Sequence, residues 1–152
     1  MKLEKYIYED HIKLDLKAKH KREVIEKLVS LLARKHALKD VEKIVQLLME
    51  REELGSTGLG EGIAIPHVRD DELFDDIYVA AARTKKPVDF DAIDDKPCQI
   101  FFLVLSPKSE EKYLKVMAAI SRIMRSQKHR EAILDAQTKT EFRDILISNG
   151  IG

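Results

Sequence analysis

One histidine in this sequence has surroundings suited to chemistry. His67 follows Pro66 in "GLGEGIAIPHVRDDE" (58–72), behind a short apolar run and in front of an acidic cluster. Proline cannot donate to a sheet ladder and pushes the preceding residue toward extended geometry, which predicts a short strand over 63–65 with His67 at its end. An imidazole is nucleophilic when neutral, and its unperturbed pKa of about 6.5 leaves it largely neutral at pH 7. The competing interpretation is an ordinary surface or core histidine with no reaction to perform.

The residues before His67 favour a phosphate as its ligand. Four of the six glycines stand at positions 55, 58, 60 and 62, and a glycine-lined loop can bring backbone N–H groups to an anion. Arg51 lies just upstream and carries a guanidinium whose geometry matches phosphate oxygens. These parts together predict a histidine that accepts a phosphoryl group and passes it on.

Other common reaction sites are not indicated. None of the five histidines forms a close pair with another His or Cys at metal-ligand spacing, so neither a metal nor a cofactor is predicted. The segment "GLGEG" is not followed by Lys as a nucleotide-phosphate loop requires, and no Gly-x-Ser-x-Gly elbow is present. The one cysteine, Cys98, cannot form an internal disulfide, and it opens the apolar run "CQIFFLVL", where we expect it to pack as a small hydrophobe.

The overall charge gives no direction toward nucleic acid or an anionic membrane. Lys plus Arg and Asp plus Glu both number 27, so any electrostatic recognition must be local. The basic stretch "KAKHKR" (17–22) could contact phosphates but is more typical of a solvated helix face. No apolar run approaches the ~20 residues that span a bilayer, and the N-terminus lacks the hydrophobic stretch of a signal peptide, so we expect a cytoplasmic location without membrane insertion.

An acidic cluster directly after His67 leaves two interpretations open. It could attract a basic surface of a partner and raise the association rate, or it could be a solvated loop. Such a docking surface also needs apolar contact, which Leu59 or Leu73 could provide. The acidic residues are Asp70, Asp71, Glu72, Asp75 and Asp76.

The elements that must position His67 follow from apolar spacing. Alternation over 12–16 predicts a strand, and apolar positions three to four apart predict helices over 21–35 and from the capping residue Asp40 to Gly55. Two strands are expected over 77–83 and 98–105, with a shorter one near 88–90. We expect Ser109 to cap a helix with an apolar stripe up to residue 124, and Thr138 with Glu141 to form a capping box.

The order of these elements predicts an α/β fold. Two helices, several strands and then further helices indicate a mixed β-sheet with helices packed on both faces. The 152 residues carry no repeat or Pro/Gly/Ser-rich linker, so a single domain over 1–152 is expected.

The segment "REELGSTGLGEGIAIPHVR" (51–69) closely resembles the active-site segment of the enzyme IIA domains of the fructose/mannitol type in the bacterial phosphoenolpyruvate-dependent phosphotransferase system. The resemblance rests on the initial Arg, on "GSTG" and above all on "GIAIPH". It extends over the whole chain in the order of its elements, through "FFLVLSP" to the C-terminal helices.

The resemblance implies specific roles. His67 is the phosphorylated residue, which takes its phosphoryl group from the histidine-containing phosphocarrier protein and hands it to an enzyme IIB domain. Arg51 stabilises the phosphate, and Ser56, Thr57 and Gly62 are expected to support its pocket. The family fold is an α/β sandwich with a mixed sheet, and the family needs neither metal nor nucleotide.

Two positions depart from the family pattern. Sugar-transporting members commonly have a second active-site histidine where this chain has Tyr113, which could donate one hydrogen bond to the phosphate or could merely pack at a helix start. Val68 replaces a small residue beside the nucleophile, and its β-branch stiffens the chain there.

The size of the chain resembles the nitrogen-regulatory branch of the family, whose members bind other proteins according to their phosphorylation state. A stand-alone component of a sugar transporter is the other role that the resemblance leaves open. The alternative of a different class is a protein-binding module that keeps the enzyme IIA fold but transfers nothing.

Overall fold

Apolar, β-branched and aromatic residues build a mixed sheet at the centre of the protein. The computed structural model describes residues 2–149, and its sheet has the strand order β1-β5-β6-β3-β2, with β4 also paired to β6. β1 is parallel to β5, β3 and β4 are parallel to β6, and the β5–β6 and β2–β3 pairs are antiparallel. The strands are β1 (Ile12–Lys13), β2 (Gly58–Gly60), β3 (Ile63–Ala64), β4 (His67–Arg69), β5 (Tyr78–Val88) and β6 (Cys98–Ser106).

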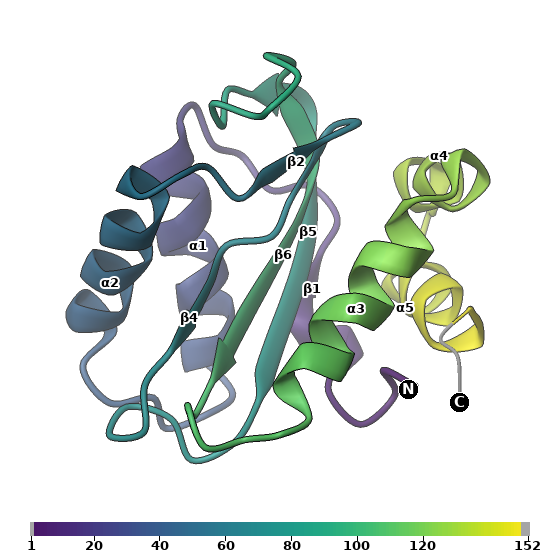
Figure 1. Cartoon of the computed structure of the whole chain (residues 1–152). Coiled ribbons are helices and arrows are strands. Elements are labelled where there is room, and N and C mark those ends of the chain that lie inside the picture. Colours follow the sequence, from purple (N-terminus) through teal and green to yellow (C-terminus); the bar gives the residue numbers. More distant parts are fainter. Residues whose placement is uncertain (1, 150–152) are drawn as a thin grey trace.

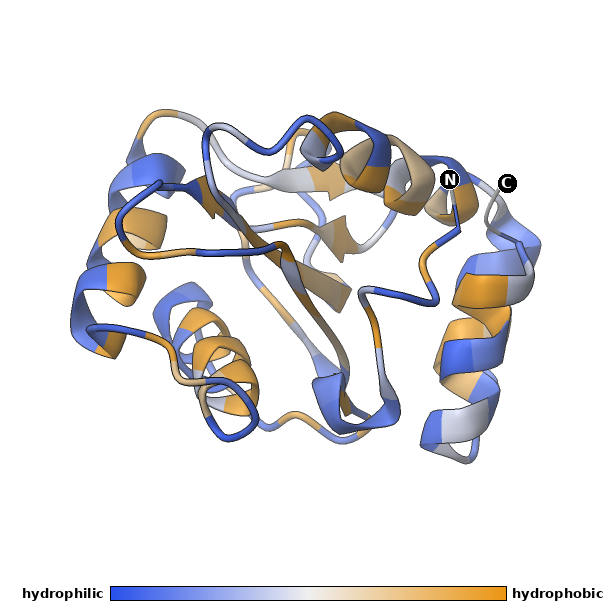
Figure 2. Ribbon diagram, turned by 90° about the horizontal axis from the view of Figure 1, so that it is seen from below, coloured by the Kyte–Doolittle hydropathy of each residue, from blue (hydrophilic) through white to orange (hydrophobic). Residues whose placement is uncertain are grey.

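Helices cover both faces of this sheet (Figure 1). α1 and α2 lie on one face, and α3, α4 and α5 lie on the other. The hydrophobic sides of the helices face the strands, and their charged sides face outward (Figure 2). The expected α/β fold is therefore confirmed. The helices are the 3-10 turn η1 (Glu9–His11), α1 (Lys21–Ala33), α2 (Val41–Glu53), α3 (Tyr113–Met124), α4 (Gln127–Asp135) and α5 (Lys139–Ser148).

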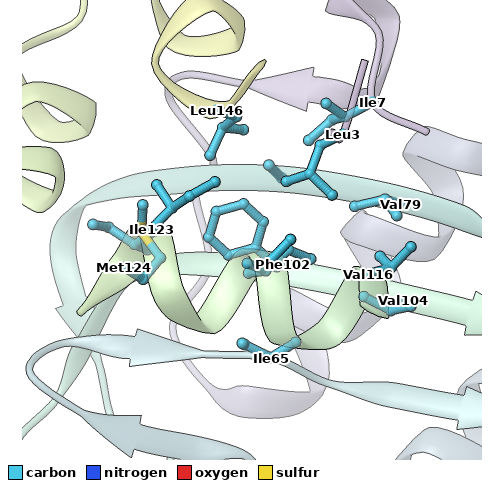
Figure 3. Packing of buried hydrophobic residues seen from close by; sticks show 14 of the residues in the cluster. Leu3, Ile7, Ile65, Val79, Phe102, Val104, Val116, Ile123, Met124 and Leu146 are labelled. Carbon is cyan, nitrogen blue, oxygen red and sulfur yellow. The ribbon is translucent and has the colours of Figure 1, made fainter. Parts of the chain in front are cut away.

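Strand β6 separates two hydrophobic cores. Phe102 and Val104 pack against the α3 side, where Figure 3 shows them beside Val116 and Ile123. The alternate residue Leu103 packs on the α1 and α2 side. All residues of β6 except Gln99 are buried, as expected for a central strand covered on both faces.

Two predicted helix caps are present. The Asp40 side chain accepts a hydrogen bond from the backbone N–H of Lys43, and Thr138 accepts one from that of Glu141. The Glu141 carboxylate accepts in return from the backbone N–H of Gln137, beside the cap.

The structure corrects four local predictions. The N-terminal strand covers only Ile12–Lys13, because Glu9–His11 forms a 3-10 turn and the chain leaves the sheet after Lys13. The glycine-rich stretch contains β2, and the strands expected over 77–83 and near 88–90 are largely one strand, β5. The third helix starts at Tyr113 rather than after Ser109, because Ser109 is hydrogen-bonded to Asp71 instead of capping a helix.

None of the helices within residues 2–149 combines the length and the apolarity that crossing a membrane requires.

Candidate functional site

His67 is the first residue of β4, not part of a glycine-lined loop. The chain breaks its pairing only at 65–66 and then resumes a strand parallel to β6, where His67 lies opposite Val104. The carbonyl of Pro66 accepts from the backbone N–H of Val104 at 3.0 Å, and the N–H of Ile65 donates to Thr57 at 3.0 Å. Hydrogen bonds therefore fix the backbone at both residues where Pro66 interrupts the strand pairing. The half-buried His67 lies on the paired strand that follows.

A backbone hydrogen bond sets the tautomer of His67. Its ring nitrogen Nδ1 lies 2.8 Å from the carbonyl oxygen of Ile65. Because a carbonyl oxygen only accepts, Nδ1 carries the proton and Nε2 keeps its lone pair. Nε2 has no hydrogen-bond partner among residues 2–149. In the neutral ring, Nε2 is therefore the nitrogen whose lone pair is free.

Tyr113 lies beside the histidine. The two ring centroids are 6.4 Å apart with 48° between the ring planes. Tyr113 is only 6% exposed, and its hydroxyl makes no hydrogen bond to another described residue. The hydroxyl oxygen nevertheless keeps some contact with solvent. Burial raises the pKa of this phenol, while the guanidinium groups of Arg69 and Arg51 lower it to a smaller extent. The hydroxyl is therefore protonated near neutral pH and can donate a hydrogen bond.

Arg51 reaches the same neighbourhood from α2. It occupies the last turn of that helix, which lies next to β4, and its Nη1 donates to the Gly55 carbonyl at 3.0 Å. Its positive charge favours a lower pKa of the Tyr113 phenol, to a smaller extent than burial raises it. Arg51 therefore lies on the helix next to the strand of His67, and among the described residues no hydrogen bond joins its side chain to His67 or Tyr113.

The hydroxyl groups of Ser56 and Thr57 are engaged elsewhere. Ser56 donates to the Phe90 carbonyl and accepts from the N–H of Gly58, while Thr57 donates to the carboxylate of Glu52. Thr57 is 3% exposed. Since each hydroxyl has a single proton, neither is left to donate to a phosphate. Any support these residues give the site acts through the shape of the 55–57 loop.

Gly62 and Leu59 lie away from His67. Ile63, next to Gly62, pairs with Ile100, whereas His67 pairs with Val104, so about 13 Å of strand separates the two levels. Gly62 has a φ of +81° in the β2–β3 hairpin, a conformation that suits glycine. Leu59 of β2 is 51% exposed on the same hairpin. The structure does not bring these two residues to the histidine.

Two acidic residues after β4 accept hydrogen bonds from nearby loop residues. Asp70 accepts from the backbone N–H groups of Glu72 and Leu73 at 2.8 and 2.9 Å. Asp71 accepts from the N–H and hydroxyl of Ser109, both at 3.0 Å, and these hydrogen bonds lower the pKa of Asp71. Both carboxylates thus shape the turn near the histidine.

Arg69 is the neighbour that the sequence prediction omitted. It lies two residues after His67 and so on the same face of β4. Its guanidinium carbon is 4.2 Å from the centre of the Tyr113 ring. The spacing His-x-Arg in a strand was the available signal, but only the fold shows that Tyr113 lies against it.

The candidate site thus consists of a half-buried histidine with a free Nε2 and a phenol beside it, on a mixed α/β sheet. Residues 5–149 match the family described as "Phosphoenolpyruvate-dependent sugar phosphotransferase system, EIIA 2". The chain belongs to this family.

Three known proteins illustrate the relationship. The fructose-specific EIIA component of Haloferax volcanii is 39% identical over 99 residues, which are 64% of this chain and 64% of that protein. The crystal structure of nitrogen regulatory protein IIA-Ntr from Neisseria meningitidis superposes with a TM-score of 0.86 at 34% identity, over 93% of this chain and 97% of that one. The fold also matches enzyme IIA of Escherichia coli, solved in complex with phosphorylated enzyme IIB for mannitol, with a TM-score of 0.79 at 21% identity over 93% and 97% of the two chains.

Some relatives are longer than the matched part. The alignment with the fructose-specific EIIABC component of Bacillus subtilis, 28% identical, covers 96% of this chain but 23% of that protein.

Proposed function

We propose that this protein carries a phosphoryl group on Nε2 of His67. The histidine-containing phosphocarrier protein would donate the group, and an enzyme IIB or a regulated target protein would receive it or respond to it. The observation that supports this most directly is the hydrogen bond between Nδ1 and the Ile65 carbonyl, which in the neutral ring leaves the lone pair on Nε2, with the Tyr113 ring beside the imidazole. We place this activity in the cytoplasm, where the donor and its phosphoenolpyruvate would be found.

The transfer needs no proton to leave His67. The Nε2 lone pair attacks phosphorus while the nitrogen–phosphorus bond of the donor phosphohistidine breaks, and that electron pair returns to the donor imidazole. The positive charge that develops on the His67 ring is stabilised by the Ile65 carbonyl at Nδ1–H. The Arg51 guanidinium and the Tyr113 hydroxyl are the groups available for the phosphoryl oxygens.

The similarity to IIA-Ntr supports a regulatory role, and the enzyme IIB complex of the mannitol protein supports a role in transfer to a sugar transporter. Both roles use the same phosphohistidine. A module that binds a partner regardless of phosphorylation is the alternative.

The test is labelling with radioactive phosphoenolpyruvate, enzyme I and the phosphocarrier protein. We expect a label that acid removes, and its loss in His67→Ala. His129→Ala is the matched control, because His129 is also half-buried and its Nδ1 lies 3.0 Å from a backbone carbonyl, that of Ile123. It should keep the label.

A wild-type protein that stays unlabelled with a cognate donor, or a label that survives in His67→Ala, contradicts the proposal. Partner capture that is the same with and without the phosphoryl group would instead favour the binding module.

A further inference from the structure

Arg69 connects the strand of His67 to the helix of Tyr113. Its Nη2 donates to the carbonyls of Lys108 and Glu110 at 2.7 and 3.0 Å, and its Nε and Nη2 lie 3.4 and 3.3 Å from that of Pro107. The remaining face of the guanidinium stacks on the Tyr113 ring at 4.2 Å. One side chain thus holds three carbonyls and an aromatic ring at once.

The segment that Arg69 holds has little other support. Residues 107–112 form no strand or helix, and Lys112 at the start of α3 provides no side-chain cap. Asp71, also just after β4, adds two hydrogen bonds to Ser109 in the same segment. Tyr113, the first residue of α3, also packs in the hydrophobic core, so contacts from the strand of His67 set its orientation together with that packing.

Arg69 also places a positive charge against the ring of Tyr113, whose own side chain cannot become cationic. A guanidinium against an aromatic face is attracted by the electrons of the ring and draws charge from it. This favours donation by the phenol O–H, and Tyr113 keeps its hydroxyl unpaired and accessible among the described residues. Nε and Nη2 of Arg69 face backbone carbonyls and its guanidinium lies on the Tyr113 ring, whereas Nη1 has no hydrogen-bond partner among the described residues. A double-mutant cycle therefore has to distinguish an effect that passes through Tyr113 from a direct contact of Nη1 with the ligand.

We propose that Arg69 is a positioning residue that orients and polarises Tyr113 as the hydrogen-bond donor to a phosphoryl group on His67. The proposal rests on the proposed function of His67. In this proposal Tyr113 binds the phosphoryl group in addition to packing in the core. Arg69 and Tyr113 together would then take the place of the second histidine that sugar-transporting members commonly have at position 113.

The first test needs no phosphorylation. The Tyr113 phenol can be titrated by NMR of its ring carbon next to oxygen, with Tyr113→Phe identifying the signal among the four tyrosines. We expect a higher pKa of Tyr113 in Arg69→Gln than in the wild type, because the charge beside the ring is lost. An unchanged titration in a folded variant overturns the polarising role.

The second test is a double-mutant cycle on the rate of His67 phosphorylation. The loss of one ordinary hydrogen bond slows a reaction by up to about tenfold, so we expect Tyr113→Phe and Arg69→Lys each to slow the phosphorylation of His67 about tenfold. The double variant should be no slower than Tyr113→Phe alone, because Arg69 acts through the hydroxyl. Arg69→Lys keeps the positive charge, so its loss of rate would report on orientation.

Arg143→Gln is the matched control. Arg143 also donates to backbone carbonyls, those of Ile7 and Glu4, and its guanidinium lies 5.7 Å from the ring centre of Tyr8 on the N-terminal segment. It should phosphorylate at the wild-type rate.

The outcomes separate this proposal from the proposed function. Suppose that the wild type is labelled, so that His67 remains a carrier. An unchanged phosphorylation rate in Tyr113→Phe then overturns the role of Arg69 and Tyr113. A full tenfold loss of rate when Arg69→Lys is added to Tyr113→Phe overturns it as well. An unlabelled wild type contradicts the carrier function, and the phenol titration then still tests whether Arg69 polarises Tyr113.

Discussion

A largely buried ion pair, between Lys21 and Glu52, supports the 55–57 loop from outside the hydrophobic cores. Glu52 of α2 accepts from Nζ of Lys21 at 3.1 Å, and their side chains are 3% and 14% exposed. Glu52 also accepts from the N–H of Thr57 at 3.2 Å and from its hydroxyl. We predict that Glu52→Ala destabilises the protein strongly.

The magnitude follows from these contacts. Breaking one side of a buried ion pair costs about 3–5 kcal/mol, and a buried donor without a partner costs about 1–3 kcal/mol. Lys21 retains Asp91 at 3.3 Å, but that carboxylate is 79% exposed and is a weak replacement. We therefore expect a loss of about 3 kcal/mol in the free energy of unfolding, the low end of the range for a broken buried ion pair. Glu52→Gln keeps an oxygen for Thr57 and should lose about 1–2 kcal/mol.

Urea denaturation followed by circular dichroism measures both losses, and thermal denaturation should show a decrease of about 6–12 °C for Glu52→Ala. Glu53→Ala is the control, since Glu53 is exposed and next in sequence, and it should change the stability by less than about 0.5 kcal/mol. A loss below about 1 kcal/mol in Glu52→Ala, or equal losses at both positions, would refute the reasoning.

Three further predictions concern buried groups. Burial raises the pKa of the Cys98 thiol to about 11, so the native protein should resist alkylation at pH 8 and react readily in urea; rapid native labelling would contradict this. Burial and the adjacent His36 hold the pKa of His11 below its ordinary value of 6.5, so as pH falls below about 6.5 the unfolded chain binds the proton first and the free energy of unfolding declines. Above about pH 6.5, His11 should not affect how the free energy of unfolding changes with pH. His11→Gln should therefore reduce the loss of stability that the protein shows on acidification. Gly58→Ala would place a Cβ 2.8 Å from that of Ala92 and should lower the melting temperature, whereas a neutral effect would show that the 91–95 loop yields.

The sequence was most informative where a single stretch decides the structure. The apolar run of β6 and the amphipathic spacing of α1 and α2 specify their own burial, and the caps at Asp40 and Thr138 lie within three residues of their partners. Such short-range signals do not depend on the rest of the fold, which is why these predictions agree with the structure.

The predictions failed where a distant segment decides. Ser109 is a good capping residue by itself, but Asp71, 38 positions away, takes both of its donors. The glycines before His67 suggested an anion loop, yet β2 pairs with β3 and carries Gly60 and Gly62 to the far end of the hairpin. Likewise, no local pattern reveals that Arg69 meets Tyr113, because 44 residues and two strands separate them in the chain.

The topology explains why the site lies where it does. β4 and β6 are parallel, so their carboxyl ends meet at the same edge of the sheet, the edge at which open α/β sheets commonly bind ligands. His67 and Arg69 stand on β4, and the chain that leaves β6 reaches Tyr113 within seven residues of Ser106. Neither strand end can move without breaking the β4–β6 pairing, so the pairing holds the histidine and Arg69 in alignment. If His67 carries a phosphoryl group as proposed, it would present the same atom first to a donor and then to an acceptor, and this rigidity would matter more for that role than an enclosed pocket.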